Sequence, residues 1–302
     1  MQADRLPIAE RRTGDIVAMR LFASGLHFAE CPRWHNGQLW MSDIWGRTVY
    51  RFDIDGTRHA VQTFDDDPGG LGWLPDGRLL VVGMERRLLF RVEPSGPVVH
   101  ADLTAFAPWP CNDMITAEDG TAYVTQFGYD VWGGTTPVLP APLLRVSPAG
   151  EVDVVARDLL CPNGIALSAD GRTLMVAEPA GSCITRFSVQ RDGSLSDRTV
   201  FAQITPASGQ QYAPPDGICL DAAGAVWAAE PIGRRVLRVE PGGRVTQEIP
   251  FDAPPLAVAL GGPDRRTLFV CFSAQISKPE RKPDPLAGIY AVDVDVPGAG
   301  RP

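Results

Sequence analysis

Short apolar runs flanking Asp-Gly-type turns recur along the whole chain. One example is the run Gly164–Leu167, the turn Asp170-Gly171 and the run Thr173–Val176. Six such turns occur at intervals of roughly 40–50 residues, at Asn36-Gly37, Asp76-Gly77, Asp119-Gly120, Asp170-Gly171, Ala223-Gly224 and Asp264-Arg265. A repeat of that length with several short strands is typical of one β-propeller blade. The pattern therefore predicts an all-β protein.

Each repeat reads as strand, turn, strand, loop and strand, and a fourth, outer strand such as Val152–Ala156 follows in most repeats. An apolar run at Ile16–Leu21 precedes the first repeat, and Ile289–Val294 ends the last. The first run can supply the outermost strand of the last blade, which closes the ring and leaves no free edge. We therefore predict a single domain over residues 1–302. It is a six-bladed β-propeller with four-stranded blades, closed by the N-terminal strand, with residues 1–14 as a tail.

Four oxygen-bearing side chains occupy one position of this repeat. They precede the Gly of their turns by seven or eight residues and are Glu30, Asn112, Asn163 and Asp216, whereas the second and sixth repeats have Gly69 and Pro255 there. Equivalent positions in a propeller surround one axis, so these side chains should converge. Two carboxylates and two amide oxygens suit a hard divalent cation, and without one the carboxylates would repel each other. Any one of them alone could be an ordinary turn residue, but that reading does not explain four at one position.

The direction of the strands places irregular connections on the same face as these polar residues. The connections span residues 127–142, 205–215 and 273–286 and are rich in Pro and Gly, as surface loops are. Trp109 and Trp132 lie in loops that should border the mouth. Acidic residues also end the second strands, but their equivalent positions indicate a structural role for Asp43, Glu85, Glu178 and Glu230.

Composition narrows the classes of function. The net charge of −8 disfavours nucleic acid and anionic membranes as partners, and no apolar run approaches the ~20 residues of a membrane span. The six cysteines form no CxxC pair, which favours buried free thiols and a cytoplasmic location. The four histidines are scattered, which argues against a His-based zinc site or a Ser-His-Asp triad. A small-molecule substrate is the expected partner, and the sequence carries no signal of oligomeric state.

Four segments resemble the regucalcin/gluconolactonase/luciferin-regenerating-enzyme (SMP-30/gluconolactonase-like) family of six-bladed propellers. They are Ala29–Trp34, Cys111–Asp113, Pro162–Ala166 and Pro215–Ile218. The resemblance implies a central divalent cation held by Glu30, Asn163 and Asp216, with Asn112 touching the cation or the substrate. The diisopropyl fluorophosphatase branch uses all four as ligands. Ca²⁺ is the favoured ion, and Zn²⁺, Mg²⁺ and Mn²⁺ are alternatives.

The chain departs from this family at Pro110. Members that act on sugar lactones carry an Arg there, two residues before the first Asn, and it binds substrate hydroxyls. Its absence favours a less polar substrate, and Trp109, Phe127 and Tyr129 lie close by in the sequence. Asp130 stands where some members place a substrate-binding acid. These four residues, with Asn112, are the predicted substrate contacts.

The leading hypothesis is a metal-dependent hydrolase acting on a lactone or related cyclic ester. Asp216 or Glu30 would orient or deprotonate the attacking water, and Asn112 would donate a hydrogen bond to the developing oxyanion. Two alternatives stay open. The same site could serve phosphotriester hydrolysis or metal-stabilised enolate or oxyanion chemistry, or the protein could be a non-enzymatic binding propeller that contains a metal.

Overall fold

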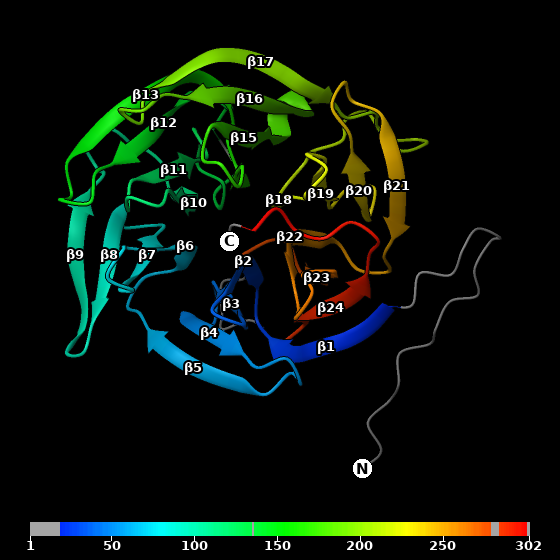
Figure 1. Cartoon of the computed structure of the whole chain (residues 1–302), viewed down its shortest axis with the longest axis horizontal. Coiled ribbons are helices and arrows are strands. Elements are labelled where there is room, and N and C mark those ends of the chain that lie inside the picture. Colours follow the sequence, from blue (N-terminus) through cyan, green and yellow to red (C-terminus); the bar gives the residue numbers. More distant parts are fainter. Residues whose placement is uncertain (1–18, 135, 279–283, 301–302) are drawn as a thin grey trace.

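The computed structural model describes residues 19–134, 136–278 and 284–300. In these residues, 24 strands form six antiparallel sheets of four strands each. The sheets are arranged as the blades of a ring around a central axis (Figure 1). The predicted six-bladed β-propeller with four-stranded blades is therefore confirmed.

Blades one to three follow the chain order, with the innermost strand first. Blade one contains β2 (Ala29–His35), β3 (Gln38–Asp43), β4 (Thr48–Phe52) and β5 (Arg58–Thr63). Blade two contains β6 (Pro68–Trp73), β7 (Leu79–Gly83), β8 (Leu88–Glu93) and β9 (Gly96–Asp102). Blade three contains β10 (Cys111–Thr116), β11 (Ala122–Gln126), β12 (Pro140–Val146) and β13 (Val152–Leu160).

Blades four to six complete the ring. Blade four contains β14 (Ile165–Leu167), β15 (Thr173–Glu178), β16 (Cys183–Val189) and β17 (Leu195–Gln203), with one 3₁₀ turn, η1 (Pro179–Gly181). Blade five contains β18 (Ile218–Leu220), β19 (Val226–Glu230), β20 (Arg235–Val239) and β21 (Val245–Pro250). Blade six contains β22 (Pro255–Gly261), β23 (Thr267–Ser273), β24 (Ala287–Asp293) and β1 (Met19–Leu26).

The N-terminal strand closes the ring as predicted. β1 pairs antiparallel with β24, beginning with Met19 opposite Val292. The strand extends beyond the expected end at Leu21, because the pairing continues through Leu26 opposite Ala287, and residues 16–18 of the expected span lie outside the described residues. Leu26 is fully buried, and burial of this side chain stabilises the longer strand. The predicted tail, residues 1–14, lies outside the described residues.

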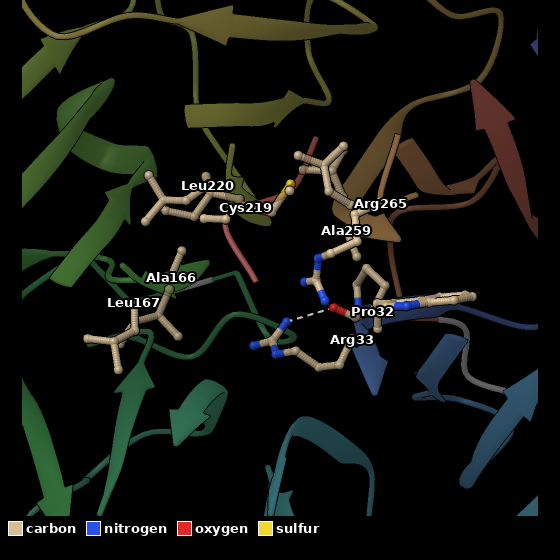
Figure 2. A pocket seen from close by; sticks show the side chains of 15 residues that line it. Pro32, Arg33, Ala166, Leu167, Cys219, Leu220, Ala259 and Arg265 are labelled. Carbon is tan, nitrogen blue, oxygen red and sulfur yellow. Dashed lines mark hydrogen bonds between the residues drawn. The ribbon is translucent and has the colours of Figure 1, made fainter. Parts of the chain in front are cut away.

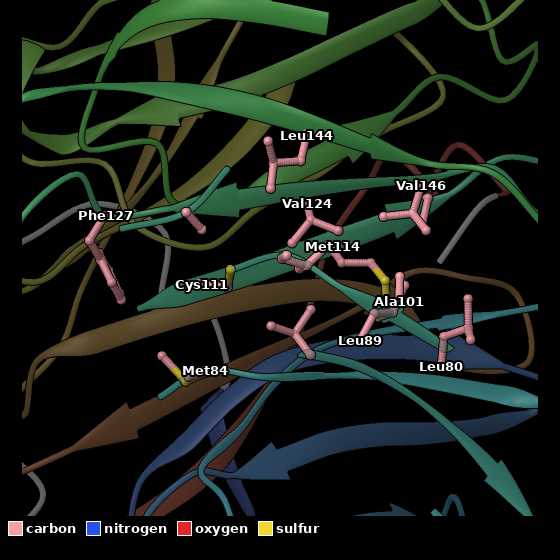
Figure 3. Close-up of a cluster of buried hydrophobic side chains, with 14 of the residues drawn as sticks. Leu80, Met84, Leu89, Ala101, Cys111, Met114, Val124, Phe127, Leu144 and Val146 are labelled. Carbon is pink, nitrogen blue, oxygen red and sulfur yellow. The ribbon is translucent and has the colours of Figure 1, made fainter. Parts of the chain in front are cut away.

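The core consists of apolar layers between neighbouring blades. Between blades two and three, Leu80 and Leu89 pack with Met114, Val124 and Leu144 (Figure 3). All five side chains are fully buried, and burying a side chain of this kind stabilises the fold by about 1.5–3 kcal/mol. This packing holds the inner strands in fixed positions around the axis.

Two further properties bear on the sequence predictions. Five of the six cysteines are buried, Cys219 is partly buried, and all six are free thiols, as predicted. No helix among the described residues is both long and apolar enough to span a membrane.

Candidate metal and active site

Irregular starts of the inner strands aim the polar side chains at the axis. In a regular strand, residues three apart point to opposite faces. In β2 the register shifts between Glu30 and Arg33, and Cys31 adopts a left-handed φ of 50°. This bulge allows both charged side chains to point into the channel. β10 has a register shift of its own, between Cys111 and Met114.

The structure brings the four predicted residues together from four blades. The side-chain amide of Asn112 donates from Nδ2 to Oδ1 of Asn163 at 2.6 Å, and the charges of Glu30 and Asp216 act on each other. The backbone N–H groups of Asn163 and Asp216 make equivalent bonds, each 2.9 Å long, to carbonyls of the neighbouring second strand. Glu30 and Asn112 are buried, whereas Asn163 and Asp216 remain partly exposed.

Two glycines allow the inner strands to approach this closely. A Cβ atom on Gly164 would lie 2.3 Å from the carbonyl oxygen of Asp216, and one on Gly217 would lie 2.3 Å from Cβ of Ala257. No side chain fits at such distances. Glycine at these two positions therefore permits the close approach of the backbone next to the polar residues.

The two carboxylates are unfavourable as an isolated pair of charges. Burial raises the pKa of Glu30 well above its usual value, and the charge of Asp216 raises it further. Burial, followed by the charge of Asp113, raises the pKa of Asp216 to about 7. A cation between the carboxylates would remove this penalty, since an opposite charge favours the ionised form.

The donor set fits a hard divalent cation. Among the described residues, no group of three or more His, Cys, Asp or Glu side chains has metal-binding geometry. Glu30, Asp216, Asn112 and Asn163 together present carboxylate and amide oxygens, the ligands that Ca²⁺ and Mg²⁺ prefer.

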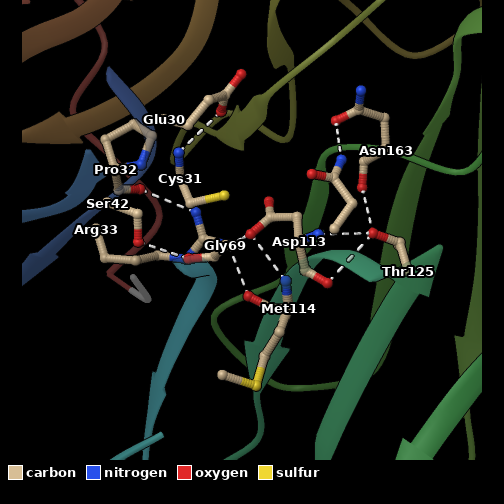
Figure 4. A network of polar contacts seen from close by, with 11 residues as sticks. Glu30, Cys31, Pro32, Arg33, Ser42, Gly69, Asp113, Met114, Thr125 and Asn163 are labelled. Carbon is tan, nitrogen blue, oxygen red and sulfur yellow. Dashed lines mark hydrogen bonds and ion pairs between the residues drawn. The ribbon is translucent and has the colours of Figure 1, made fainter. Parts of the chain in front are cut away.

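The sequence analysis missed a buried ion pair beside this site. Arg33 donates from Nη2 to Oδ1 of Asp113 and to the carbonyl of Met114, both at 2.6 Å, and from Nη1 to the carbonyl of Pro32 at 2.9 Å (Figure 4). The two side chains are only 4% and 5% exposed. Arg33 and Asp113 lie in the same sequence segments as Glu30 and Asn112. Two opposite charges without a predicted role in those segments were the sequence signal for this ion pair.

This ion pair sets the charge of the site. Asp113 is a third carboxylate near the axis, and its charge acts on both Glu30 and Asp216. Because Arg33 neutralises Asp113, the charge left on the axis is that of Glu30 and Asp216 alone. One divalent cation balances those two charges.

Below the ion pair, the channel ends in a small cavity. Its volume is about 20 Å³, and Arg33, Cys219 and Arg265 point into it, with Gly298 and Ala299 along its wall (Figure 2). The C-terminal segment covers this face, since the Ala299 N–H donates to the carbonyl of Leu220 at 3.0 Å. There is room for roughly one water molecule, so a substrate has to approach from the opposite, loop-bearing face.

The predicted substrate contacts occupy different positions on that face. Burial and then the neighbouring Cys161 raise the pKa of the Tyr129 phenol, and the charge of Asp216 also contributes. Phe127 is buried at the end of β11, and its N–H donates to the carbonyl of Pro110 at 3.2 Å. Asp130 accepts the Gly133 N–H at 2.8 Å, which shapes its own loop. Trp109 is partly exposed on the β9–β10 connection.

Three of the four acids that end second strands have the structural role predicted for them. Asp43, Glu178 and Glu230 are buried and accept backbone N–H groups of nearby connections. Glu85 differs: its side chain is 40% exposed, and it accepts a hydrogen bond from Lys278 at 3.0 Å. In that blade, Asp66 accepts the backbone N–H of Arg86 at 3.2 Å, so the prediction was wrong for Glu85.

The raised pKa values predict a pH-dependent stability of the metal-free protein. In the unfolded chain the pKa of Asp216 has its ordinary value of 3.8, but in the folded protein this pKa is about 7. Between these values the folded state binds the extra proton, so this carboxyl reduces the free energy of unfolding as the pH rises from about 4 to about 7. Glu30 acts in the same direction.

The measurement is denaturant unfolding in EDTA at several pH values, for the wild type and for Asp216→Asn. The stability difference, wild type minus variant, should fall with rising pH, and added Ca²⁺ should stabilise the wild type more at pH 8 than at pH 5. A difference that is independent of pH would contradict the proposed burial of these charges.

Comparisons with known proteins agree with this architecture. A family model described as the SMP-30/Gluconolactonase/LRE-like region matches residues 28–274. The 6-deoxy-6-sulfogluconolactonase of Pseudomonas putida is 35% identical over 163 residues, covering 53% of this chain and 55% of that protein. The chain thus matches about half the length of this relative. Pentonolactonase XacC of Haloferax volcanii is 26% identical over 261 residues, covering 84% of each.

Solved structures share the fold. A luciferin-regenerating enzyme superposes with a TM-score of 0.78 at 17% identity, covering 93% of this chain and 97% of that one. A calcium-binding protein, regucalcin from Agrobacterium tumefaciens, superposes with a TM-score of 0.77 at 20% identity, covering 95% and 97%. At such identities the likeness establishes the architecture alone.

Proposed function

The chain belongs to the SMP-30/gluconolactonase/LRE-like family, and from that premise we propose that it is a metal-dependent hydrolase of a lactone or related cyclic ester. The observation that carries the proposal is the pair of buried or partly buried carboxylates, Glu30 and Asp216, whose charges act on each other, together with the two hydrogen-bonded amides of Asn112 and Asn163. Lactonases among the relatives, such as the pentonolactonase, support the substrate class.

A divalent cation held by Glu30, Asn163, Asp216 and Asn112 would polarise the ester carbonyl and make water more acidic. Asp216 would accept the proton of the attacking water, since it is the more exposed of the two carboxylates. Asn112 uses one hydrogen of Nδ2 for Asn163, and the other can be donated to the developing oxyanion. The neutral phenol of Tyr129 can donate a hydrogen bond to the ring oxygen.

The thiols near the site support water as the nucleophile. Burial raises the pKa of Cys111 and of Cys161 to about 12, and burial also raises that of Cys31 well above its usual value. Such thiols stay protonated near neutral pH and are poor nucleophiles. Free thiols throughout the chain also support our proposal of a reducing, cytoplasmic location.

The proposal is tested by metal analysis and a substrate screen on one sample. The purified protein is stripped with EDTA, reloaded separately with Ca²⁺, Mg²⁺, Mn²⁺ or Zn²⁺, and assayed on lactones and phosphotriesters. We expect one cation per chain, Ca²⁺ as the favoured ion, and lactone hydrolysis that returns only on reloading. Hydrolysis of phosphotriesters but not lactones would indicate the alternative chemistry, and stoichiometric metal without turnover would indicate a binding propeller.

A further inference from the structure

Five aromatic rings form a continuous wall at the loop-bearing face. This aromatic wall comprises Phe28, Trp45, Phe127, Tyr129 and Trp132. Trp132 is central, with its ring centroid 6.5 Å from Phe28, 6.1 Å from Trp45 and 6.5 Å from Phe127. Phe28 and Trp45 are 4.1 Å apart, and Phe127 and Tyr129 are 6.3 Å apart.

Phe28, Trp45 and Phe127 are buried in the core that blades two and three share, whereas Tyr129 and Trp132 pack against them and are partly exposed. Phe28 precedes Glu30 by two residues and lies immediately before β2, the innermost strand of blade one. Phe127 follows Gln126, which pairs with Cys111 next to Asn112. Phe127 and Cys111 lie at one end of the core between blades two and three (Figure 3). Blades one and three are not neighbours, so the contact between Phe28 and Trp132 places the Trp132 side chain across blade two.

Lys278 fastens Trp132 in this position. Its Nζ atom lies 5.2 Å from the centre of the Trp132 ring and donates to Asp67 at 2.6 Å and to Glu85 at 3.0 Å. Lys278 belongs to the β23–β24 connection of blade six, whereas the two acids belong to blade two. The exposed Glu85 thus helps to hold Lys278 beside the aromatic wall instead of capping a backbone connection.

The two sides of the site therefore differ in polarity. On the side of blades one to three the aromatic wall rises next to the buried Glu30 and Asn112, and its rings carry only two indole N–H groups and one phenol as polar groups. On the opposite side Asn163 and Asp216 keep some exposure to solvent.

We propose that the substrate is a lactone with an apolar alkyl substituent that packs against the aromatic wall, and that Trp132 determines this specificity. This inference rests on the proposed lactone hydrolysis. Each methylene placed on the wall should raise kcat/KM about fourfold, the factor that corresponds to about 0.8 kcal/mol. Hydroxyl groups on the same substituent would lose their hydrogen bonds to water and would not find enough hydrogen-bond partners on the rings. Pro110 also supplies no hydrogen-bond donor at the position where sugar-lactone members carry an Arg.

The experiment measures kcat/KM of the cation-loaded full chain for γ-butyrolactone, γ-hexalactone, γ-octalactone and glucono-δ-lactone. We expect a rise of about fourfold per methylene through the alkyl series. In Trp132→Ala the ratio of kcat/KM values per added methylene should fall close to one. Trp132→Phe should keep most of the fourfold ratio, and Lys278→Met should lower it in part. Trp40→Ala, which removes an indole on the opposite, turn-bearing face, should leave both the ratio and the basal activity unchanged.

Two outcomes would overturn the inference. One is faster hydrolysis of glucono-δ-lactone than of the alkyl lactones. The other is an unchanged ratio per methylene in Trp132→Ala, which would make Trp132 a purely structural residue. If no lactone is hydrolysed with any cation, the proposed function fails, and γ-alkyl lactams, which are not hydrolysed, still test the wall through tryptophan fluorescence. Lactam affinity should then rise with chain length, and affinity that is independent of chain length would refute the wall.

Discussion

Replacing Asp216 by Asn should lower kcat/KM for lactone hydrolysis roughly 10²- to 10⁴-fold, the range observed when a positioned acid or base is removed. The substitution keeps the size of the side chain but removes one of the two charges that a cation would balance. It also removes the group that accepts the proton of the attacking water. Cation affinity, measured by calorimetry, should fall together with activity.

The matched control is Asp170→Asn. Asp170 is an exposed residue of a turn on the opposite face, where it caps the turn by accepting the Arg172 N–H at 3.0 Å. We expect this variant to keep the activity and the cation affinity of the wild type. Wild-type hydrolysis by purified Asp216→Asn would reject the proposed mechanism.

Replacing Arg33 by Met should destabilise the protein by about 3–5 kcal/mol, because it leaves the carboxylate of Asp113 buried without a partner. Asp113 is only 5% exposed, so solvent cannot replace the lost ion pair. The free energy of unfolding, from chemical denaturation with saturating cation, gives this cost directly.

The double variant Arg33→Met/Asp113→Asn separates charge from packing. Removing both charges should recover part of the lost stability, since a buried pair costs more when one partner is removed than when both are. Arg78→Met is the exposed comparison. It breaks exposed ion pairs with Asp76 and Glu93, and it should cost far less than Arg33→Met, because solvent screens charges at the surface. Equal losses in the free energy of unfolding for Arg33→Met and Arg78→Met would show that the buried ion pair is no more important for stability than the exposed ones.

Local pattern and chain direction were sufficient to predict most of this architecture. Strand alternation and the repeated turns depend on residues close in the sequence, so the six blades and their closure by the N-terminal strand could be inferred. Boundaries were less predictable. β2 begins at Ala29 because Cys31 adopts a left-handed backbone conformation, and nothing in the local sequence indicates such a bulge.

The role of Glu85 illustrates a second limit. Equivalence with Asp43, Glu178 and Glu230 predicted the same buried role, but those three acids end their strands, whereas Glu85 lies two residues beyond the end of β7. The partner that changes its role, Lys278, lies 193 residues away in the sequence. Repeat equivalence carries no information about such a contact, because it depends on how one connection crosses the surface of another blade.

The sequence by itself determined the propeller, the face that carries the site and the four polar residues around its axis, because all three follow from a repeat that closes on itself. Only the tertiary structure decided the charge of that site, through the pairing of Arg33 with Asp113. It alone also revealed the aromatic wall, where Trp132 meets Phe28 and Trp45. Both features join side chains from different blades, and their contacts arise only after the ring has formed.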